Sequence, residues 1–454
     1  MTEEGRGGSE PQVADDDGAR GAGPDDDRDA RLRALLSVPL GMPQPVAAPT
    51  ARPQPPGGAE EVPPPEDDPG DAPPAGPRIT FGTVLSVLVL LGLFATGAGL
   101  VYAGTRIIRS STEGEVLTQE TDPAAPGYEA LVSPTPTLLV IHDVDGLVAD
   151  LTVLTLPDPS AGGGGVVLVP TRTVSDLPIF GYAPIEAAYD LGTADQQAEV
   201  VGDVLTTGIG EVVVVDEERW AGLVAPVAPL SIDNLDDLEV DGELRFPAGD
   251  LELEADDVGA YLAAIQEGES DLARLFRHRT FWEAWLEAVA AADDPTAVPG
   301  ELEVGIGRFV RTLAAGSTVV ETLPVAPVVV EDYDDQPTFA PEAEEVATLV
   351  ADLVPLPRSP RPGVRPRVRL LNGTDDLDRA RELALALPPV GVEVSVVGNA
   401  RDLDEPTTTI AYANPSHEEA AVAIRDLLGV GDVLVDPRPS DVVDITVTLG
   451  ADHD

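Results

Sequence analysis

Runs of apolar and polar positions divide the chain into segments of different character. From Ile79 to Ala103 the sequence is apolar without one charged residue, and arginines flank this run on both sides. At ~1.5 Å per residue, roughly 25 helical residues reach past a ~30 Å hydrocarbon core. A buried core helix or the apolar part of a signal peptide is usually shorter. The pattern therefore predicts one transmembrane helix within residues 78–106.

The segment before this run is polar and poor in aromatic residues. Residues 1–77 are rich in Pro, Gly, Asp and Ala, so they cannot bury enough apolar surface to offset the entropy of ordering. We expect a disordered tail. Within it, Asp29–Leu40 has leucines at helical spacing behind an Asp that can cap a helix. Two interpretations stay open for this stretch: a docking helix, or transient structure within the tail, which the surrounding composition favours.

Beyond the apolar run, residues 107–135 are a polar connector, and β-branched runs then alternate with helical patterns. The strand-like runs are 138–144, 151–156, 166–170 and 211–216. The helical patterns are 184–192, 194–208 and 270–292. Strands that alternate with helices over about 200 residues predict one α/β domain with a layered sheet, residues 136–330.

The last third of the chain contains a second connector and a smaller domain. Residues 331–365 are acidic and Pro-rich, with a helical pattern at 341–353. Residues 366–450 then alternate short strands with two helices, which predicts a small α+β domain. Its second helix is expected to bury one stripe against the sheet, made of Ala420, Ile424 and either Leu427 or Leu428.

Composition narrows the classes of partner and chemistry. The 454 residues include 81 acidic and 27 basic side chains, for a formal charge of −54, which opposes binding to nucleic acid. The acid excess favours a hydrated surface that stays soluble in salty or alkaline surroundings. The chain has no cysteine, so disulfides and cysteine nucleophiles are excluded. Its four histidines are far apart in sequence and form no metal-ligand motif.

Five motifs follow one another in the C-terminal domain: VRLLNGT at 368–374, VGVEVSVVGNA at 390–400, TTTIAYAN at 407–414, AAVAIRDLLG at 420–429 and DITVTLGAD at 444–452. In this order they resemble the LytR C-terminal domain, an extracytoplasmic module of bacterial envelope proteins. Asn372 and Gly373 suit a tight turn between strand and helix, because both tolerate positive φ. The domain offers no evident nucleophile or acid–base pair.

The middle domain has landmarks of another family: LLVIHDVDG at 138–146, Asp150, VPTRT at 169–173, IEAAY at 185–189 and SDLARLFRHR at 270–279. In layout they resemble the LytR-CpsA-Psr family. The resemblance implies a membrane-tethered α/β domain that transfers polyprenyl-diphosphate-linked glycopolymers to the cell wall. Such work needs arginines for the diphosphate and carboxylates for a magnesium ion.

Several family positions have changed. Val148 replaces an arginine before the early aspartate, Thr171 and Arg172 replace an Arg-Asp pair, and an expected Arg-x-Arg pair is absent after AYLAAIQEG. Loss of several charge-assisted contacts, each worth roughly 1.5–3 kcal/mol, weakens the grip on a diphosphate. The family positions that remain, and that are the candidate catalytic residues, are Asp150, Arg172, Asp271, Arg274 and Arg277.

Alternatives stay open for three features of the middle domain. Asp271 and Arg274 are three residues apart, so they suit either a solvated ion pair on a helix or the family's site. Trp282, Trp285 and Val289 suit a filled core better than an aromatic-lined lipid pocket. The four glycines at 162–165 lack the Lys-Ser/Thr of a phosphate-binding loop, so we expect a flexible hairpin loop.

Flanking charge alone does not orient the predicted span. One arginine precedes it and two follow closely, which leans toward an outer N-terminus. Both resemblances imply the opposite orientation, with the tail in the cytoplasm and the two domains outside the bacterial cell membrane. Small residues at Ala95, Gly99 and Ala103 lie on one helical face, a spacing that permits a homodimer.

Two main functional hypotheses follow. The first is a membrane-anchored envelope protein that binds or scaffolds without catalysis in glycopolymer attachment or envelope maintenance, with a cell-wall polymer or polyprenyl phosphate as partner and no cofactor. The alternative is a diverged glycopolymer phosphotransferase that uses Asp150, Asp271 and Arg274, with magnesium at the two aspartates. Clustering of these three side chains at one pocket mouth is the signature of this alternative. A third hypothesis, regulation through the tail, rests only on the tail's length and on the segment 29–40.

Overall fold

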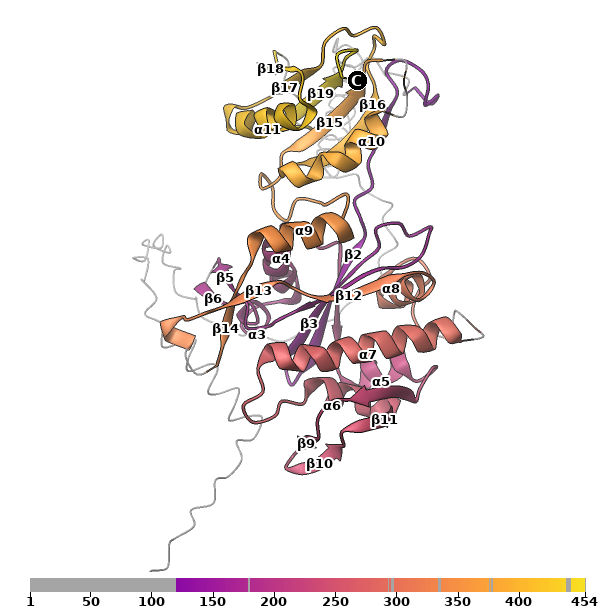
Figure 1. The fold of residues 1–454 in the computed structure, drawn as a ribbon, viewed down its shortest axis with the longest axis vertical. Coiled ribbons are helices and arrows are strands. Elements are labelled where there is room, and N and C mark those ends of the chain that lie inside the picture. Colours follow the sequence, from indigo (N-terminus) through magenta and orange to yellow (C-terminus); the bar gives the residue numbers. More distant parts are fainter. Residues whose placement is uncertain are drawn as a thin grey trace, which may run out of the picture. The chain divides into compact units, whose positions relative to one another are not determined.

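The computed structural model describes residues 120–453, except 179, 293, 295–297, 334–335, 375, 377–378 and 438–441 (Figure 1). The predicted tail, the segment Asp29–Leu40, the predicted span at 78–106 and its small-residue seam lie outside these residues. Within the described part of the chain, no helix combines the length and the hydropathy that a membrane span requires.

A five-stranded mixed sheet forms the centre of the α/β domain. Its strand order is β12(Thr318–Thr322), β4(Gly164–Val169), β3(Leu147–Thr155), β2(Thr137–Val144) and β7(Glu211–Val215). β3 is antiparallel to both of its neighbours, whereas β7 and β12 pair in parallel at the two edges. β2 and β3 are buried along most of their length, because helices cover both faces. This explains why β2 carries the continuous apolar run Leu138–Ile141.

Successive side chains of β2 point to opposite faces of the sheet and pack in two separate hydrophobic cores. Leu138 and Val140 belong to one core, and Leu139 and Ile141 belong to the other. The first core, on one face of the sheet, includes α5(Glu217–Val224), α6(Val258–Ala263), α7(Asp271–Ala291) and α8(Gly305–Ala314). The second includes α3(Ala187–Asp190), α4(Ala194–Val204) and α9(Ala343–Leu353), and Figure 1 shows α9 and α7 on opposite sides of the sheet. The predicted layered α/β domain is confirmed.

Short elements complete the domain. Four two-stranded ribbons pair β5(Val174–Leu177) with β6(Gly181–Pro184), β8(Leu230–Asn234) with β11(Gly249–Leu253), β9(Leu238–Val240) with β10(Glu243–Phe246), and β13(Val325–Val328) with β14(Thr338–Pro341). Two 3₁₀ turns are η1(Ala255–Asp257) and η2(Glu331–Tyr333).

The segment 331–365 differs from the predicted connector. It contributes β14 and α9 to the α/β domain, and α9 buries Val346, Val350 and Leu353 in the second core. The three residues recur at helical spacing, so the helix predicted at 341–353 is confirmed. Its Pro-rich flank and acidic start gave the segment the composition of a linker, although its apolar stripe is needed to cover the sheet.

The C-terminal domain is a six-stranded sheet with two helices. Its strand order is β1(Glu129–Leu131), β16(Glu393–Asn399), β15(Arg367–Asn372), β19(Ile445–Leu449), β17(Thr409–Tyr412) and β18(Asp432–Val435). The helices are α10(Arg379–Ala386) and α11(Glu418–Leu428), with 3₁₀ turns η3(Pro388–Val390) and η4(Pro415–His417). In α11, Ile424 is buried and Leu428 packs on the core, whereas Leu427 is 46% exposed. Leu428 is therefore the residue that completes the predicted stripe.

Strand β1 comes from the predicted connector 107–135. It pairs antiparallel with β16, so that Glu129 lies opposite Gly398. A Cβ atom on Gly398 would lie only 2.1 Å from the carbonyl oxygen of Tyr128. The absence of a side chain at Gly398 thus lets Tyr128 and Glu129 approach β16 closely.

The glycine run at 162–165 joins β3 to β4, as the hairpin prediction requires. It is not a loose loop. The amide of Gly163 donates to the carbonyl of Thr312, and a Cβ atom at Gly163 would lie 2.2 Å from the carbonyl oxygen of Ser317. Close packing against the chain between α8 and β12 therefore explains the glycines.

Candidate functional site

Asp150 lies inside the sheet of the α/β domain, opposite a histidine. The antiparallel register of β2 and β3 pairs His142 with Asp150, and Nδ1 of His142 is 3.0 Å from Oδ2 of Asp150. The hydroxyl of Thr152 donates to Oδ1 at 3.4 Å. Asp150 is 2% exposed and His142 is fully buried. Since a carboxylate only accepts hydrogen bonds, Nδ1 of His142 carries the proton in this pair.

A second histidine reaches Asp150 from α7. Nδ1 of His278 is 4.0 Å from Oδ1 of Asp150, and Nε2 of His278 donates to the carbonyl of Leu262 at 2.9 Å. Burial lowers the pKa of His278 to about 4, although Asp150 opposes this shift. Burial raises the pKa of Asp150, but His278, His142 and Arg274 outweigh it and lower that pKa to about 2. At neutral pH the cluster therefore holds an ionised aspartate and a neutral His278.

The first turn of α7 carries the ion pair of Asp271 and Arg274. Ser270 caps this helix by accepting from the amide of Ala273. Nη2 of Arg274 donates to Oδ1 of Asp271 at 2.8 Å, and the amide of Arg172 donates to Oδ2 at 3.3 Å. The two side chains are only 5% and 7% exposed. The interpretation as a solvated helix pair is thus wrong, because the loop after β4 covers the pair.

The side chain of Arg172 points into a different set of acceptors. Nη1 donates to Oε1 of Glu186 at 3.4 Å, and Nη2 donates to the carbonyls of Tyr333 and Gln336. Glu186 belongs to the segment just before α3, and Tyr333 ends η2. Arg172 therefore fastens the loop after β4 to two neighbouring segments, while its amide supports Asp271.

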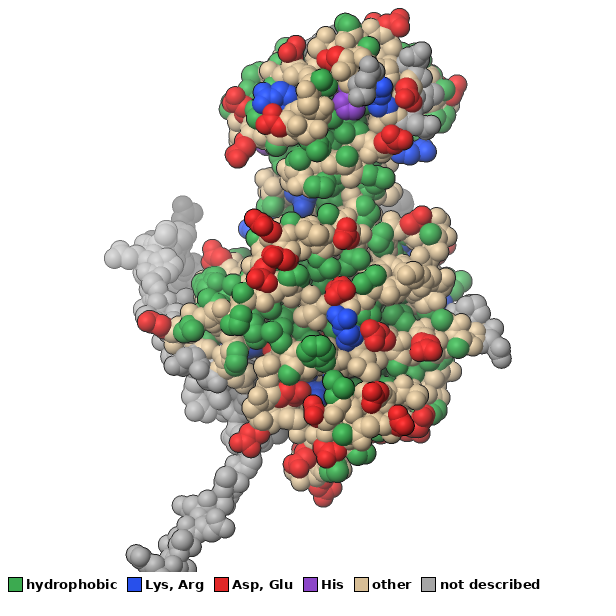
Figure 2. Space-filling view, in the orientation of Figure 1, with side chains coloured by type: hydrophobic (Ala, Val, Ile, Leu, Met, Phe, Trp, Pro, Cys, Tyr) green, Lys and Arg blue, Asp and Glu red, His purple; other side chains and the backbone are tan. Residues whose placement is uncertain are grey.

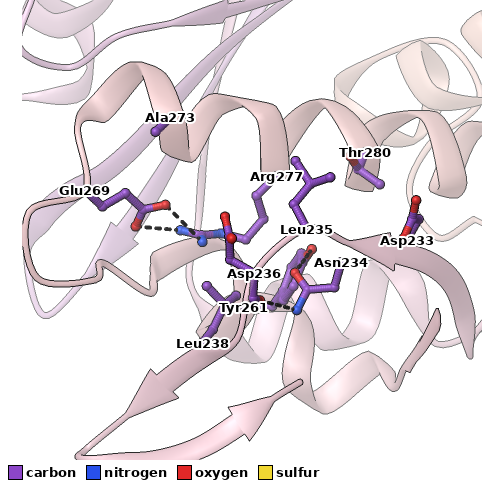
Figure 3. A pocket seen from close by; sticks show the side chains of 10 residues that line it. All are labelled: Asp233, Asn234, Leu235, Asp236, Leu238, Tyr261, Glu269, Ala273, Arg277 and Thr280. Atoms are coloured by element: carbon purple, nitrogen blue, oxygen red, sulfur yellow. Dashed lines mark hydrogen bonds and ion pairs between the residues drawn. The ribbon is translucent and has the colours of Figure 1, made fainter. Parts of the chain in front are cut away.

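Arg277 lies one helical turn beyond Arg274 and lines a pocket. It donates to both carboxylate oxygens of Glu269 at 3.2 and 3.3 Å (Figure 3). It also donates to the carbonyl of Ala264. Burial lowers the pKa of the Arg277 guanidinium, and Glu269 opposes this shift. The pocket beside it measures about 290 Å³ including the part open to solvent, and α7 contributes Ala273, Arg277 and Thr280 to its wall.

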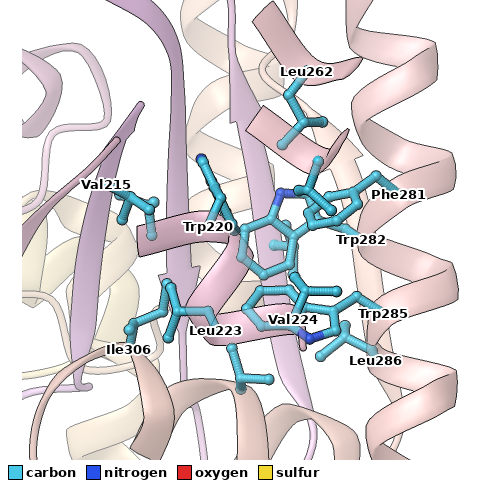
Figure 4. Packing of buried hydrophobic residues seen from close by; sticks show 14 of the residues in the cluster. Val215, Trp220, Leu223, Val224, Leu262, Phe281, Trp282, Trp285, Leu286 and Ile306 are labelled. Carbon is cyan, nitrogen blue, oxygen red and sulfur yellow. The ribbon is translucent and has the colours of Figure 1, made fainter. Parts of the chain in front are cut away.

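Aromatic side chains fill the space between α7 and the sheet. Trp282 and Trp285 are 2% and 0% exposed, with ring centroids 5.3 Å apart, and both pack on Trp220 of α5 (Figure 4). Phe281 stacks on Trp285 with centroids 5.7 Å apart. Val289 is also buried in this core. The prediction of a filled core is confirmed.

Among the candidate residues, Asp150, Asp271 and Arg274 come together. The charge of Arg274 acts on both aspartates, through a direct pair with Asp271 and at longer range on Asp150. They do not form a pocket mouth, since all three side chains are buried. The sequence reasoning missed His142 and His278. The one available signal was a histidine within an apolar strand, eight residues before an aspartate in the next strand.

The two aspartates do not fit a magnesium ion as they are arranged. The oxygens of Asp150 face His142 and Thr152, and those of Asp271 face Arg274 and the amide of Arg172. No group of three His, Cys, Asp or Glu side chains suited to a metal ion occurs among the residues the structure describes. Magnesium would have to displace these donors, because a carboxylate that accepts protein hydrogen bonds offers few free lone pairs.

The Asn372–Gly373 turn of the C-terminal domain has a structural role. Nδ2 of the Asn372 side chain donates to the carbonyl of Thr374, and the backbone amide of Thr374 donates to Oδ1 of Asn372. A Cβ atom on Gly373 would lie 2.4 Å from the carbonyl oxygen of Leu449. The pair thus has a structural role where β15 ends beside β19, but neither residue adopts the positive φ on which the turn prediction rested.

Comparison with solved structures finds similar chains of low sequence identity. TagV of B. subtilis is 20% identical, with 49% of this chain and 98% of that chain covered and a TM-score of 0.41. A transcriptional regulator from Enterococcus faecalis is 18% identical, with coverages of 48% and 88% and a TM-score of 0.40. The LytR-CPS2A-psr family protein TagT of B. subtilis, with bound octaprenyl pyrophosphate lipid, is 15% identical, with coverages of 52% and 94% and a TM-score of 0.38.

No curated protein sequence matches this chain. Among protein families, the model described as LytR cell envelope-related transcriptional attenuator matches residues 365–453. These residues span all the strands of the C-terminal sheet except β1. They also contain each of the five motifs on which the resemblance of the C-terminal domain rests. Residues 365–453 of this chain are therefore a LytR C-terminal domain.

Proposed function

We propose that this chain is a membrane-anchored protein of the bacterial cell envelope that binds or scaffolds, without catalysis, in cell-wall glycopolymer attachment or envelope maintenance. The LytR C-terminal domain supports the place in the envelope. The apolar run at 79–103 supports the anchor. The motifs of the α/β domain support a cell-wall polymer or a polyprenyl phosphate as the partner.

The observation that carries the non-catalytic role is the internal pairing of the retained arginines. Arg172 contacts Glu186, Arg274 contacts Asp271, and Arg277 contacts Glu269. The six side chains are between 5% and 15% exposed. A diphosphate needs cations that can turn toward it. Here each guanidinium would have to leave a buried carboxylate, and an unpaired buried charge is strongly unfavourable.

The filled core supports the same proposal. A polyprenyl chain needs an apolar cavity, but Trp220, Phe281, Trp282 and Trp285 occupy the space between α7 and the sheet. Protein interiors are as densely packed as organic crystals, so a lipid could enter only by displacing these rings. Any lipid contact in this proposal is therefore at the surface of the domain.

A transfer assay tests the proposal. The purified chain is incubated with a labelled polyprenyl-diphosphate glycan and peptidoglycan, beside an active LytR-CpsA-Psr enzyme as the positive control. We expect no labelled peptidoglycan above background at any magnesium concentration, while the chain still cosediments with the wall polymer. Transfer of label by the chain would overturn the non-catalytic role.

One observation favours the alternative of a diverged glycopolymer phosphotransferase. Asp150, Asp271 and Arg274 come from two distant parts of the chain and meet in one buried cluster. If the transfer assay is positive, Arg274→Ala should abolish transfer while circular dichroism shows the fold retained. An Arg274→Ala variant that is folded and fully active would remove this alternative.

The orientation and the self-association of the span are part of the proposal. We propose a cytoplasmic tail and extracytoplasmic domains; protease treatment of intact cells should then remove the domains and spare residues 1–77. The reverse cleavage pattern would invert the orientation. For the seam of Ala95, Gly99 and Ala103, Gly99→Leu should weaken homodimers in a membrane two-hybrid assay, and an unchanged signal would exclude this seam.

A further inference from the structure

The segment that precedes the α/β domain lies along the C-terminal sheet beyond the limits of β1 (Figure 1). Before β1, the amide of Gly127 donates to the carbonyl of Ala400 at 3.0 Å. After β1, the amide of Val132 donates to the carbonyl of Ser395 at 3.0 Å. Main-chain contacts with β16 and its end therefore continue over six residues. We call residues 123–132 the stalk.

A buried asparagine of β16 contacts the backbone of the stalk. Nδ2 of Asn399 donates to the carbonyls of Pro123 and Ala125 at 2.9 and 3.0 Å. Its backbone amide donates to the carbonyl of Tyr128 at 2.8 Å, and the residue is 6% exposed. Both hydrogens of the side-chain amide are thus committed to the stalk. They recognise its main chain rather than its side chains.

Three further contacts fit the edge of the sheet to this segment. Gly398 leaves free the space that the carbonyl oxygen of Tyr128 occupies. Arg369 of β15 is 3.8 Å from the carboxylate of Glu129. Val132 packs against the core of the C-terminal domain. Main-chain hydrogen bonds thus supply attraction along the edge, while the charge of Glu129 and the apolar side chain of Val132 add specificity.

The groups that receive the stalk belong to the C-terminal domain itself. Gly398 and Asn399 lie in the motif VGVEVSVVGNA at 390–400, within the matched residues 365–453, whereas the stalk lies outside them. Without the stalk, β16 would be an open sheet edge, which readily pairs with an extended chain. Acidic side chains are spread over both domains on the face shown in Figure 2. Hydrogen bonds and shape, rather than net charge, therefore distinguish this edge.

We infer that the β16 edge of the LytR C-terminal domain is a peptide-binding site, and that its ligand is the chain's own stalk, bound as an added strand. The stalk begins 20 residues after the apolar run that ends at Ala103. In the proposed membrane-anchored protein, the tether is thus attached to the C-terminal domain before the chain enters the α/β domain. This consequence rests on the proposed anchor, whereas the binding site does not.

Peptide binding to the full-length chain tests the site. Ala130→Pro releases β1, because proline in the middle of the strand cannot donate to the ladder. A labelled peptide with the sequence of residues 121–133 should then bind the open edge, about tenfold more tightly than it binds the parent chain, whose edge is filled. Fluorescence anisotropy measures both affinities. The same peptide with Ala130→Pro is the matched control and should not bind. Equal binding by the two chains, or of the two peptides, would overturn the inference.

A second substitution tests the role of Asn399. Added to the Ala130→Pro chain, Asn399→Ala should weaken the peptide about tenfold, because two hydrogen bonds to the stalk are lost. Asn414→Ala, at the start of η4 in the same domain, is the control and should weaken it less than about twofold. Thermal midpoints of all chains identify any variant that misfolds. Equal losses for the two asparagine variants would contradict recognition by Asn399.

A disulfide test keeps the stalk in place and shows which copy supplies it. The chain has no cysteine, and Leu131 lies directly opposite Val396, so Leu131→Cys with Val396→Cys introduces one pair within reach of a disulfide. We expect a cross-link within one chain on oxidation. Leu131→Cys with Leu434→Cys, on β18 at the other edge of the sheet, is the control and should form no such cross-link.

Two results of this test would refute the site as inferred. One is the absence of the link between positions 131 and 396 in the double variant. The other is a covalent dimer joined through these positions when chains with one substitution each are co-expressed, because the stalk would then come from a second copy. Flotation with liposomes measures the proposed anchor separately. A chain that forms the internal link but does not float would refute the anchor and support the strand site.

Discussion

Asp150 and His142 lie directly opposite each other on two antiparallel strands, with Nδ1 of His142 3.0 Å from Oδ2 of Asp150. His278 approaches the other oxygen of the same carboxylate from α7. An ionised carboxylate thus lies between two imidazoles in the interior, and it is tolerated there because His142 and Thr152 donate hydrogen bonds to it. The arrangement ties the strands of the sheet to the helix that carries Arg274.

Asp150→Asn should destabilise the α/β domain. The carboxylate accepts from both His142 and Thr152, whereas an amide offers one accepting oxygen and turns a donor toward the other partner. We expect a loss of about 2 kcal/mol in the free energy of unfolding, measured by urea denaturation. Asp176→Asn, on an exposed position of β5, is the matched control and should change stability by less than about 0.5 kcal/mol. Equal effects would contradict the role of Asp150.

Acid should destabilise the protein in two steps. The pKa of His278 is about 4 in the folded state, below its ordinary value of 6.5, so the unfolded chain binds the proton first as pH falls. Stability should therefore decrease from about pH 6.5 to about pH 4, by on the order of 3 kcal/mol. Asp150, with a folded pKa of about 2, adds a further loss between about pH 4 and pH 2.

His278→Gln separates these two steps. Glutamine keeps a donor for the carbonyl of Leu262 but does not titrate. Urea denaturation across the pH range should show that the variant lacks the extra decrease between pH 6.5 and 4 seen in the parent chain. An unchanged pH profile would show that another group causes the acid sensitivity.

Trp282→Ala should cost about 3–5 kcal/mol, because the ring is buried against Trp220, Phe281 and Trp285 and the cavity it leaves cannot collapse fully. Phe276→Ala on the same helix is the control. Its ring is 62% exposed, so its loss should stay below about 1 kcal/mol. Thermal denaturation followed by near-ultraviolet circular dichroism compares the two. A small loss for Trp282→Ala would mean that the core is loosely packed and open to a lipid.

Glu269→Gln tests whether the ion pair with Glu269 prevents Arg277 from binding a diphosphate. Glutamine keeps one accepting oxygen but no negative charge, so the guanidinium loses one of its two bonds to residue 269 and carries an uncompensated charge. We expect the variant to bind inorganic pyrophosphate by calorimetry, about tenfold more tightly than the parent chain. Glu283→Gln, exposed on the same helix, should leave pyrophosphate binding unchanged. Tight binding by the parent chain itself would contradict the pairing argument.

Gly398→Ala should loosen β1 from β16. The added Cβ atom would lie 2.1 Å from the carbonyl oxygen of Tyr128, so the strand must move away. Hydrogen exchange at Leu131 and Val396 should accelerate in the variant. Gly222→Ala in α5 is the matched control, since its Cβ atom meets nothing within 4 Å. It should raise stability by about 0.5 kcal/mol, because alanine favours the helix. Unchanged exchange in Gly398→Ala would show that β1 does not need the close approach.

Most strands and helices could be predicted from local pattern, because burial on one or both faces leaves a periodic or continuous apolar signal. The four strand-like runs of the middle domain became β2, β3, β4 and β7. β1 was missed because three residues carry no periodicity and their partner lies more than 260 positions later. The segment 331–365 was misjudged as a connector, since its composition outweighed the short apolar stripe of α9.

The candidate site could be predicted only in part. Asp271 and Arg274 share a helical turn, so their pairing follows from sequence spacing. Their burial does not, because it depends on the loop of Arg172, almost 100 residues earlier. The two histidines beside Asp150 come from positions 142 and 278, and no local motif connects them.

The sequence by itself determined the types of element, the order of the domains, the acidic surface and the LytR C-terminal domain, because these follow from local periodicity, composition and contiguous motifs. Only the tertiary structure decided which charged side chains are buried and which partner each has. A charge in water and the same charge inside a protein differ by several kcal/mol, and contacts between distant residues set that difference. The sequence leaves Arg277 available to bind a diphosphate, but the fold pairs its guanidinium with Glu269.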